Sequence, residues 1–138
     1  MLLSYVSDSD LKKESFIELA YKLAYSNSEY PEAQRDLLRH YKDACKIDVI
    51  PNTSTKEELI SFFSKESPKV RRIVYFEIYM LLASDGKIDD KERKTLSELR
   101  SAFDISDEDA EKIQSQGLLV RQAHQDLEKL LFIENDYE

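Results

Sequence analysis

The fourteen residues from Val70 to Ala83, VRRIVYFEIYMLLA, are apolar on nearly every side of the helix that they would form. Pro68 lies just before them, where proline suits the first turn of a helix. A helix that is hydrophobic almost all round is buried by other helices rather than exposed to water. We therefore expect this helix to lie in the middle of a helical bundle.

The rest of the chain predicts further helices around it. The 138 residues include only two Gly and three Pro, which argues against a loop-rich or all-β protein. We expect one all-α domain over residues 1–138, a compact bundle of about seven helices. Thr55 and Glu58 have the spacing of a capping box at the start of the third helix, and Ser106 is expected to cap the sixth. Gly117 is expected to end the sixth helix. The seven are predicted near Ser9 to Tyr25, from Pro31 through Cys45, from Thr55 through Phe63, from Pro68 to Ala83, from Asp89 to Phe103, from Ser106 to Gly117, and from Val120 to Leu131.

An internal repeat relates two of the predicted helix pairs. The segment Glu18–Ala24 aligns with Glu77–Ala83 and, after a one-residue slip in the turn, the downstream residues align as well. The aligned pairs are Arg35 with Arg93, Leu38 with Leu96, Ala44 with Ala102, and Ile47 with Ile105. We therefore predict a degenerate duplication whose halves cover about residues 9–48 and 68–106.

Charge and composition exclude several classes of protein. The formal net charge of −8 makes nucleic-acid binding unfavourable, because a phosphate backbone would be repelled. No apolar run approaches membrane-spanning length, so we expect no direct insertion into a membrane. Cys45 is the only cysteine, which rules out an internal disulfide and a paired-cysteine zinc motif. The apolar start, Met1–Val6, is short and lacks a basic leader, so a cytoplasmic location is expected.

The segment Asp85-Gly86-Lys87-Ile88-Asp89-Asp90-Lys91-Glu92 matches the second half of a calcium-binding EF-hand loop. It contains the glycine of the sharp turn and, six residues later, the glutamate that would bind the ion through both oxygens. The first half of such a loop would fall inside the apolar helix at Leu81 and Ala83. Asp85, Asp89 and Glu92 therefore define at most a weak, partly hydrated site for Ca²⁺ or another divalent cation.

The same residues are more typical of a corner between two helices, because helix caps are far commoner than half-loops that bind a metal. Gly86 can adopt the left-handed conformation that follows a helix end. Asp89 and Glu92 have the spacing of a capping box, in which each side chain accepts a hydrogen bond from the backbone of the other residue. The upstream copy of the corner has Ser26-Asn27 in place of Asp-Gly. A metal site at the corner would therefore exist in one half only.

Glu77 is the acidic residue of the apolar helix, and Glu18 is its counterpart in the repeat. A carboxylate in a buried helix must be paired, because an isolated buried charge is costly. One interpretation is a metal site built from both carboxylates inside the bundle, although the Glu-x-x-His pairs of di-iron proteins are missing. The other is that each glutamate pairs with a tyrosine hydroxyl or an arginine, such as Arg35 or Arg93.

The segment from Leu81 to Glu92, followed by Leu96, Leu99 and Phe103–Glu108, resembles the TerB-like family. That family includes tellurite-resistance TerB proteins and the N-terminal domain of DjlA-type co-chaperones. The resemblance covers about residues 70–115 and implies an all-helical fold of about seven helices. It also implies that Asp85, Asp89 and Glu92 belong to an acidic patch of the kind proposed to bind metal in the family. It favours binding over catalysis.

We therefore expect a non-enzymatic module that binds a protein partner, in stress response or tellurite resistance. The chain has no P-loop, GxSxG, HExxH or GxGxxG motif. The alternative is a metal-dependent enzyme or a metal sensor that uses Glu18, Glu77 and the acidic corner. A third interpretation is a homodimer formed through Phe62 and Phe63, which we expect to be exposed.

Overall fold

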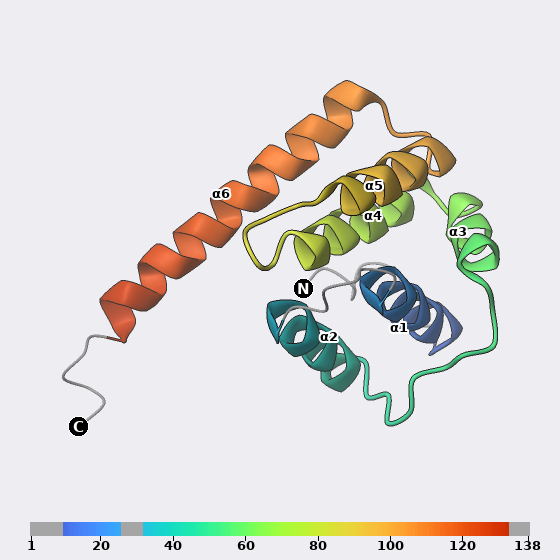
Figure 1. Cartoon of the computed structure of the whole chain (residues 1–138), viewed down its shortest axis with the longest axis horizontal. Helices are drawn as coiled ribbons and strands as arrows, with labels where there is room; N and C mark the ends of the chain where they lie inside the picture. Colours follow the sequence, from blue (N-terminus) through green and yellow to red (C-terminus); the bar gives the residue numbers. More distant parts are fainter. Residues whose placement is uncertain (1–9, 26–31, 133–138) are drawn as a thin grey trace.

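Six helices make up the part of the chain that the computed structural model describes, residues 10–25 and 32–132 (Figure 1). They are α1 (Asp10–Tyr25), α2 (Glu32–Ala44), α3 (Lys56–Ser64), α4 (Pro68–Leu82), α5 (Asp90–Ala102) and α6 (Asp107–Leu131). The described residues contain no strand, so the all-helical prediction is confirmed. The predicted helix starts at Ser9 and Pro31 lie outside the described residues, as does Ser26-Asn27.

The central position predicted for the apolar helix is confirmed. α4 contacts each of the other five helices. Its first turn contains Pro68, and the Ser67 hydroxyl accepts a hydrogen bond from the Val70 amide at 3.3 Å, which satisfies one of the free N–H groups of a helix start. Most of its side chains are buried, on more than one face. The other helices therefore pack around α4.

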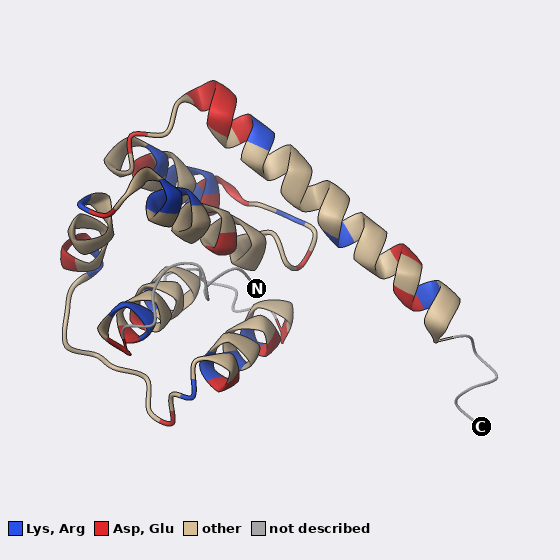
Figure 2. Cartoon of the chain, turned by 180° about the vertical axis from the view of Figure 1, so that it is seen from behind, with Lys and Arg blue, Asp and Glu red and all other residues tan. Residues whose placement is uncertain are grey.

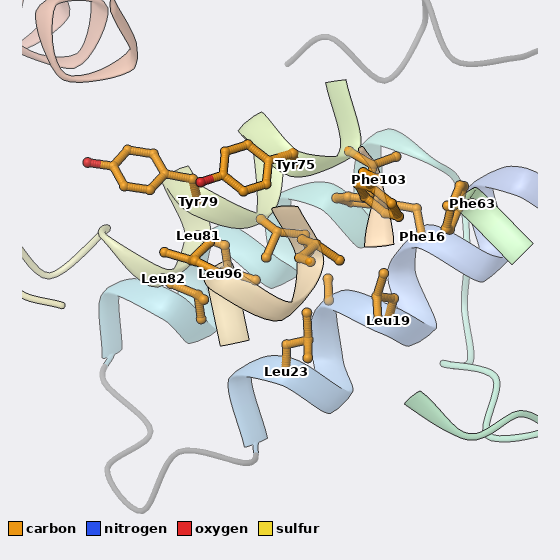
Figure 3. Packing of buried hydrophobic residues seen from close by; sticks show 14 of the residues in the cluster. Phe16, Leu19, Leu23, Phe63, Tyr75, Tyr79, Leu81, Leu82, Leu96 and Phe103 are labelled. Atoms are coloured by element: carbon orange, nitrogen blue, oxygen red, sulfur yellow. The ribbon is translucent and has the colours of Figure 1, made fainter. Parts of the chain in front are cut away.

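The hydrophobic core joins α4 to α1, α3 and α5. Figure 3 shows leucines and aromatic rings of these elements gathered in one cluster, among them Phe16, Phe63 and Phe103, none of which is exposed. The Tyr41 ring from α2 and the Phe16 ring form a T-shaped pair at a centroid distance of 5.5 Å. Phe63 was expected at the surface but belongs to this core, and Phe62 is half-buried against it. The predicted homodimer contact through exposed Phe62 and Phe63 is therefore wrong.

α2 and α5 end in the same way. Lys46 follows α2 with a φ of 57°, and Asp104 follows α5 with a φ of 54°, so both adopt the left-handed conformation. Their amides donate to the carbonyls three residues earlier, at 3.1 and 3.2 Å. The next residues, Ile47 and Ile105, donate to the carbonyls five residues earlier, both at 3.1 Å. This is the Schellman arrangement, formed twice without the usual glycine.

α6 runs without a break through Gly117, so the prediction that this residue ends a helix is wrong. The two last predicted helices are one helix, Asp107–Leu131, which begins at the predicted cap Ser106. Gly117 is buried where α6 crosses α4, and a Cβ there would lie 2.9 Å from both the Met80 sulfur and Cε1 of Phe76. The glycine lets the two helices approach closely. Beyond this crossing α6 extends away from the other helices (Figure 1).

None of the described helices is both long enough and apolar enough to cross a membrane. Even the 25 residues of α6 include charged side chains along its length (Figure 2).

Candidate functional site

The Asp-Gly corner between α4 and α5 is held by hydrogen bonds within its own residues. Gly86 has a φ of +84°, as predicted, and an added Cβ would meet no atom within 4 Å. The glycine is therefore required by the backbone conformation and not by crowding. The Asp85 side chain accepts a hydrogen bond from the Lys87 amide at 3.0 Å, which closes a small turn.

The predicted capping box at the start of α5 is confirmed. Oδ1 of Asp89 accepts from the Glu92 amide at 2.7 Å, and Oε1 of Glu92 accepts from the Asp89 amide at 3.1 Å. A second predicted box, Thr55 with Glu58, opens α3 in the same way. These bonds satisfy backbone donors that a helix start leaves free.

The second oxygen of Glu92 faces the inside of the molecule. It accepts a hydrogen bond from Nε2 of Gln34, on α2, at 2.9 Å, and the same nitrogen lies 3.4 Å from the Leu82 carbonyl oxygen. Gln34 is fully buried and Glu92 is 5% exposed. Burial raises the pKa of Glu92, and the charges of Asp89 and Asp85 act in the same direction against the hydrogen bonds that lower it. Both Glu92 oxygens thus serve contacts within the protein.

The two buried glutamates of the repeat have different surroundings. The Glu18 carboxylate accepts hydrogen bonds from the amides of Thr53 and Ser54, at 3.1 and 2.8 Å, and its nearest cation is Lys22 at 3.8 Å. It therefore fastens the segment that leads into α3 onto α1. Of the two arginines that the sequence suggests as partners, Arg93 lies 3.7 Å from Asp90.

Glu77, 4% exposed, lines a groove between α2, α4 and α6. The Tyr41 hydroxyl donates to the Glu77 backbone carbonyl at 3.4 Å. Burial raises the pKa of the Tyr41 phenol well above its ordinary value, and the Glu77 carboxylate adds to this effect. This bond involves the Glu77 backbone and not its carboxylate, so the predicted pairing of the carboxylate with a tyrosine hydroxyl or an arginine stays a prediction.

No three His, Cys, Asp or Glu side chains of residues 10–25 and 32–132 come close enough together to hold a metal ion. The predicted carboxylates are distributed over three places: the corner for Asp85, Asp89 and Glu92, the α3 approach for Glu18, and the groove for Glu77. The metal hypotheses of the corner and of the bundle interior remain predictions.

The groove has a volume of about 630 Å³. Its walls are mostly apolar, and the polar lining includes Glu77, Arg121 and two histidines. The lining residues are Leu37, His40 and Tyr41 of α2, Phe76, Glu77 and Met80 of α4, the following Ser84, and Val120, Arg121 and His124 of α6. The Arg121 guanidinium donates to the Ala83 carbonyl and so ties α6 to the end of α4. The groove is thus the place where α6 leaves the body of the protein.

Along its second half, α6 carries an apolar stripe that the other described residues leave exposed. We call this the C-terminal stripe: Leu119, Val120, Ala123, Leu127, Leu130 and Leu131. The helical repeat places these residues on one side of the helix. All six are exposed, Leu130 to 75% and Leu131 to 58%. The opposite side carries Gln122, Gln125 and Lys129.

Comparison with models of known protein families, with curated proteins and with solved structures finds no match.

Sequence reasoning identified the capping residues but missed Gln34, the groove and the exposure of the stripe. A signal for Gln34 was present, because the register that aligns Arg35 with Arg93 also aligns Gln34 with Glu92. The groove depends on the angle at which α6 leaves α4, which no local pattern encodes.

Proposed function

We propose that the protein is a non-enzymatic, TerB-like helical module that binds another protein chain through the C-terminal stripe of α6 and the adjoining groove. The observation that carries this proposal is that the stripe is exposed on the part of α6 that extends beyond the other helices. The resemblance of residues 70–115 to the TerB-like family supports a role in stress response, including tellurite resistance. The alternative, a metal-dependent enzyme or sensor, has no clustered donors among the described residues to support it.

The energetics of the stripe favour a protein partner. Burying one leucine side chain contributes about 1.5–3 kcal/mol relative to exposing it. Isolated exposed leucines are common, but a contiguous row on one face of a helix marks an interaction surface. Of the ten exposed large hydrophobic side chains among the described residues, seven lie in residues 118–132. A partner helix in this position would bury several of them at once.

We also propose that α1–α2 and α4–α5 are copies of one helix pair. The matching ends of α2 and α5 support this, because the two left-handed residues, Lys46 and Asp104, occupy aligned positions of the predicted repeat. The hydrogen bond between Gln34 and Glu92 also joins aligned positions. In this arrangement the duplicated pairs form the body and α6 is the element outside the repeat that carries the binding surface.

In-cell photo-crosslinking tests the proposed function. A photoreactive amino acid replaces Leu130, within the stripe, or Leu118, which lies on the opposite side of α6. The proposal predicts a covalent adduct with a protein from position 130, identified by mass spectrometry, and a much weaker one from position 118. Equal labelling from both positions, or none from position 130, would contradict it.

A further inference from the structure

We infer that the protein which covers the C-terminal stripe is a second copy of this chain, bound through an antiparallel, two-fold symmetric pairing of the two α6 helices. The inference rests on the proposed function, because it names the partner of the same surface. It follows from the charge order along α6 and from the position of the groove.

Charge makes the second half of α6 suited to self-association. The whole chain carries a net charge of −8, so two copies repel each other over most of their surfaces. Residues 118–132, in contrast, contain two basic residues, Arg121 and Lys129, and two acidic residues, Asp126 and Glu128. A locally neutral surface lets two acidic chains meet without like-charge repulsion.

The order of these charges favours the antiparallel direction. Arg121 and Glu128 lie on the same edge of the stripe, two turns apart. A two-fold axis between residues 124 and 125 places Arg121 of one copy opposite Glu128 of the other, and this happens twice. On the other edge, the same axis places Leu119 opposite Leu130. In a parallel pair in register, the edge with Arg121 and Glu128 would instead face the other edge of the partner helix, with Leu119 and Leu130, and neither ion pair would form.

The groove is covered by the same arrangement. With a rise of about 1.5 Å per residue, residue 132 of one copy reaches the level of residue 117 of the other, about 11 Å beyond the axis. Leu131 of each copy therefore arrives beside Phe76, Met80 and Val120 of the other, residues that line the groove. The same two-fold axis would thus cover both the stripe and the groove.

The surface area needed for a stable dimer indicates that the groove belongs to the contact. The exposed part of α6, residues 118–132, is about 22 Å long. A helix pair of that length alone falls below the roughly 800 Å² per partner of a standard stable interface. Inserting each helix end against α2 and α4 of the other copy enlarges the buried surface, and the isologous symmetry makes every added contact count twice.

Sedimentation equilibrium of the full chain over a wide concentration range tests the inference. The wild-type chain is expected to form a dimer. Leu127→Glu should weaken the dimer about a hundredfold, because a tenfold loss in each copy acts twice. The matched control Leu118→Glu introduces the same charge on the opposite side of the helix and should leave the dimer intact. Circular dichroism verifies that both variants fold.

Two further variants test the direction of pairing. Arg121→Glu and Glu128→Arg should each dissociate the homodimer, whereas a mixture of the two chains should form a heterodimer with both ion pairs restored. In a Cys45→Ser background, Val120→Cys and Leu131→Cys chains should crosslink to each other under oxidation, and Leu131→Cys should not crosslink to itself.

Each contrary outcome refutes a defined part of the inference. A chain that stays monomeric, a dimer that tolerates Leu127→Glu, or equal loss with Leu118→Glu would overturn self-association through the stripe. Self-crosslinking of Leu131→Cys would overturn the antiparallel direction. A monomer whose position 130 crosslinks to a different protein overturns this inference while the proposed function stands, and the absence of any adduct overturns both.

Discussion

Replacing Gly117 with alanine would test why α6 runs unbroken past α4. An ideal Cβ at this position lies 2.9 Å from the Met80 sulfur and 2.9 Å from Cε1 of Phe76, whereas ordinary contacts begin near 3.4 Å. Both side chains must therefore retreat by several tenths of an ångström at once. They lie one turn apart on α4, so they flank the same spot and restrict each other's movement. The clash can otherwise be relieved only if α6 moves away from α4.

The net effect follows from two opposing contributions. Alanine in place of glycine in a helix interior gains about 1 kcal/mol in helix propensity. Overpacking a filled contact costs about 1–3 kcal/mol. We therefore expect Gly117→Ala to lower the free energy of unfolding by about 1 kcal/mol. In a Phe76→Leu/Met80→Ala background the crowding atoms are gone, so the same substitution should raise it by about 1 kcal/mol.

Urea unfolding followed by circular dichroism measures all four proteins of this double-mutant cycle. The expected coupling between Gly117→Ala and the α4 substitutions is about 2 kcal/mol, with an opposite sign of the alanine effect in the two backgrounds. The slope of the free energy against urea should stay constant. An alanine effect of the same sign and size in both backgrounds would refute the packing explanation for Gly117.

Other predictions concern the helix ends and the corner. Lys46→Gly and Asp104→Gly should each raise the free energy of unfolding by about 0.5–1 kcal/mol, because glycine removes the left-handed strain, and Asp43→Gly inside α2 should lower it by a similar amount. The pKa of Glu92 is raised in the folded protein. Between the ordinary pKa of a glutamate and this raised pKa, the native state therefore binds more protons than the unfolded chain. The free energy of unfolding should therefore fall as the pH rises through that window. Glu92→Gln should lose this part of the pH dependence, and an unchanged pH profile would contradict it. Millimolar calcium should leave the melting temperature unchanged, because the corner carboxylates already accept hydrogen bonds from N–H groups. A rise that Asp85→Asn abolishes would restore the calcium interpretation.

Local patterns predicted the features that depend on residues close in the sequence. The boxes at Thr55 and Asp89, the cap at Ser106 and the left-handed Gly86 all depend on residues within one turn. The central place of α4 could also be predicted, because a helix without a polar face needs cover on all sides.

Features that depend on distant residues could not be predicted in the same way. A glycine near the middle of an amphipathic pattern is compatible with a helix end or with close helix packing, and only Phe76 and Met80 on α4 decide between them at Gly117. Phe62 and Phe63 have the same chemistry, yet the fold buries one completely and the other in part. The inward direction of Glu92 depends on Gln34, 58 residues earlier.

The position of Gly117 links the packing of α6 to the proposed self-association. A helix that ended at Gly117 would let residues 118–132 take any direction, whereas a continuous helix holds the C-terminal stripe in line with the groove. If Gly117→Ala lifts α6 from α4, the groove changes shape and the end of the partner helix loses contact with Met80. We therefore expect Gly117→Ala to weaken the dimer severalfold, although residue 117 lies outside the stripe. In the Phe76→Leu/Met80→Ala background, adding Gly117→Ala should not weaken the dimer any further. Sedimentation equilibrium of the four proteins would measure this. If the Gly117→Ala dimer were as tight as the wild type, dimer formation would not depend on how α6 packs against α4.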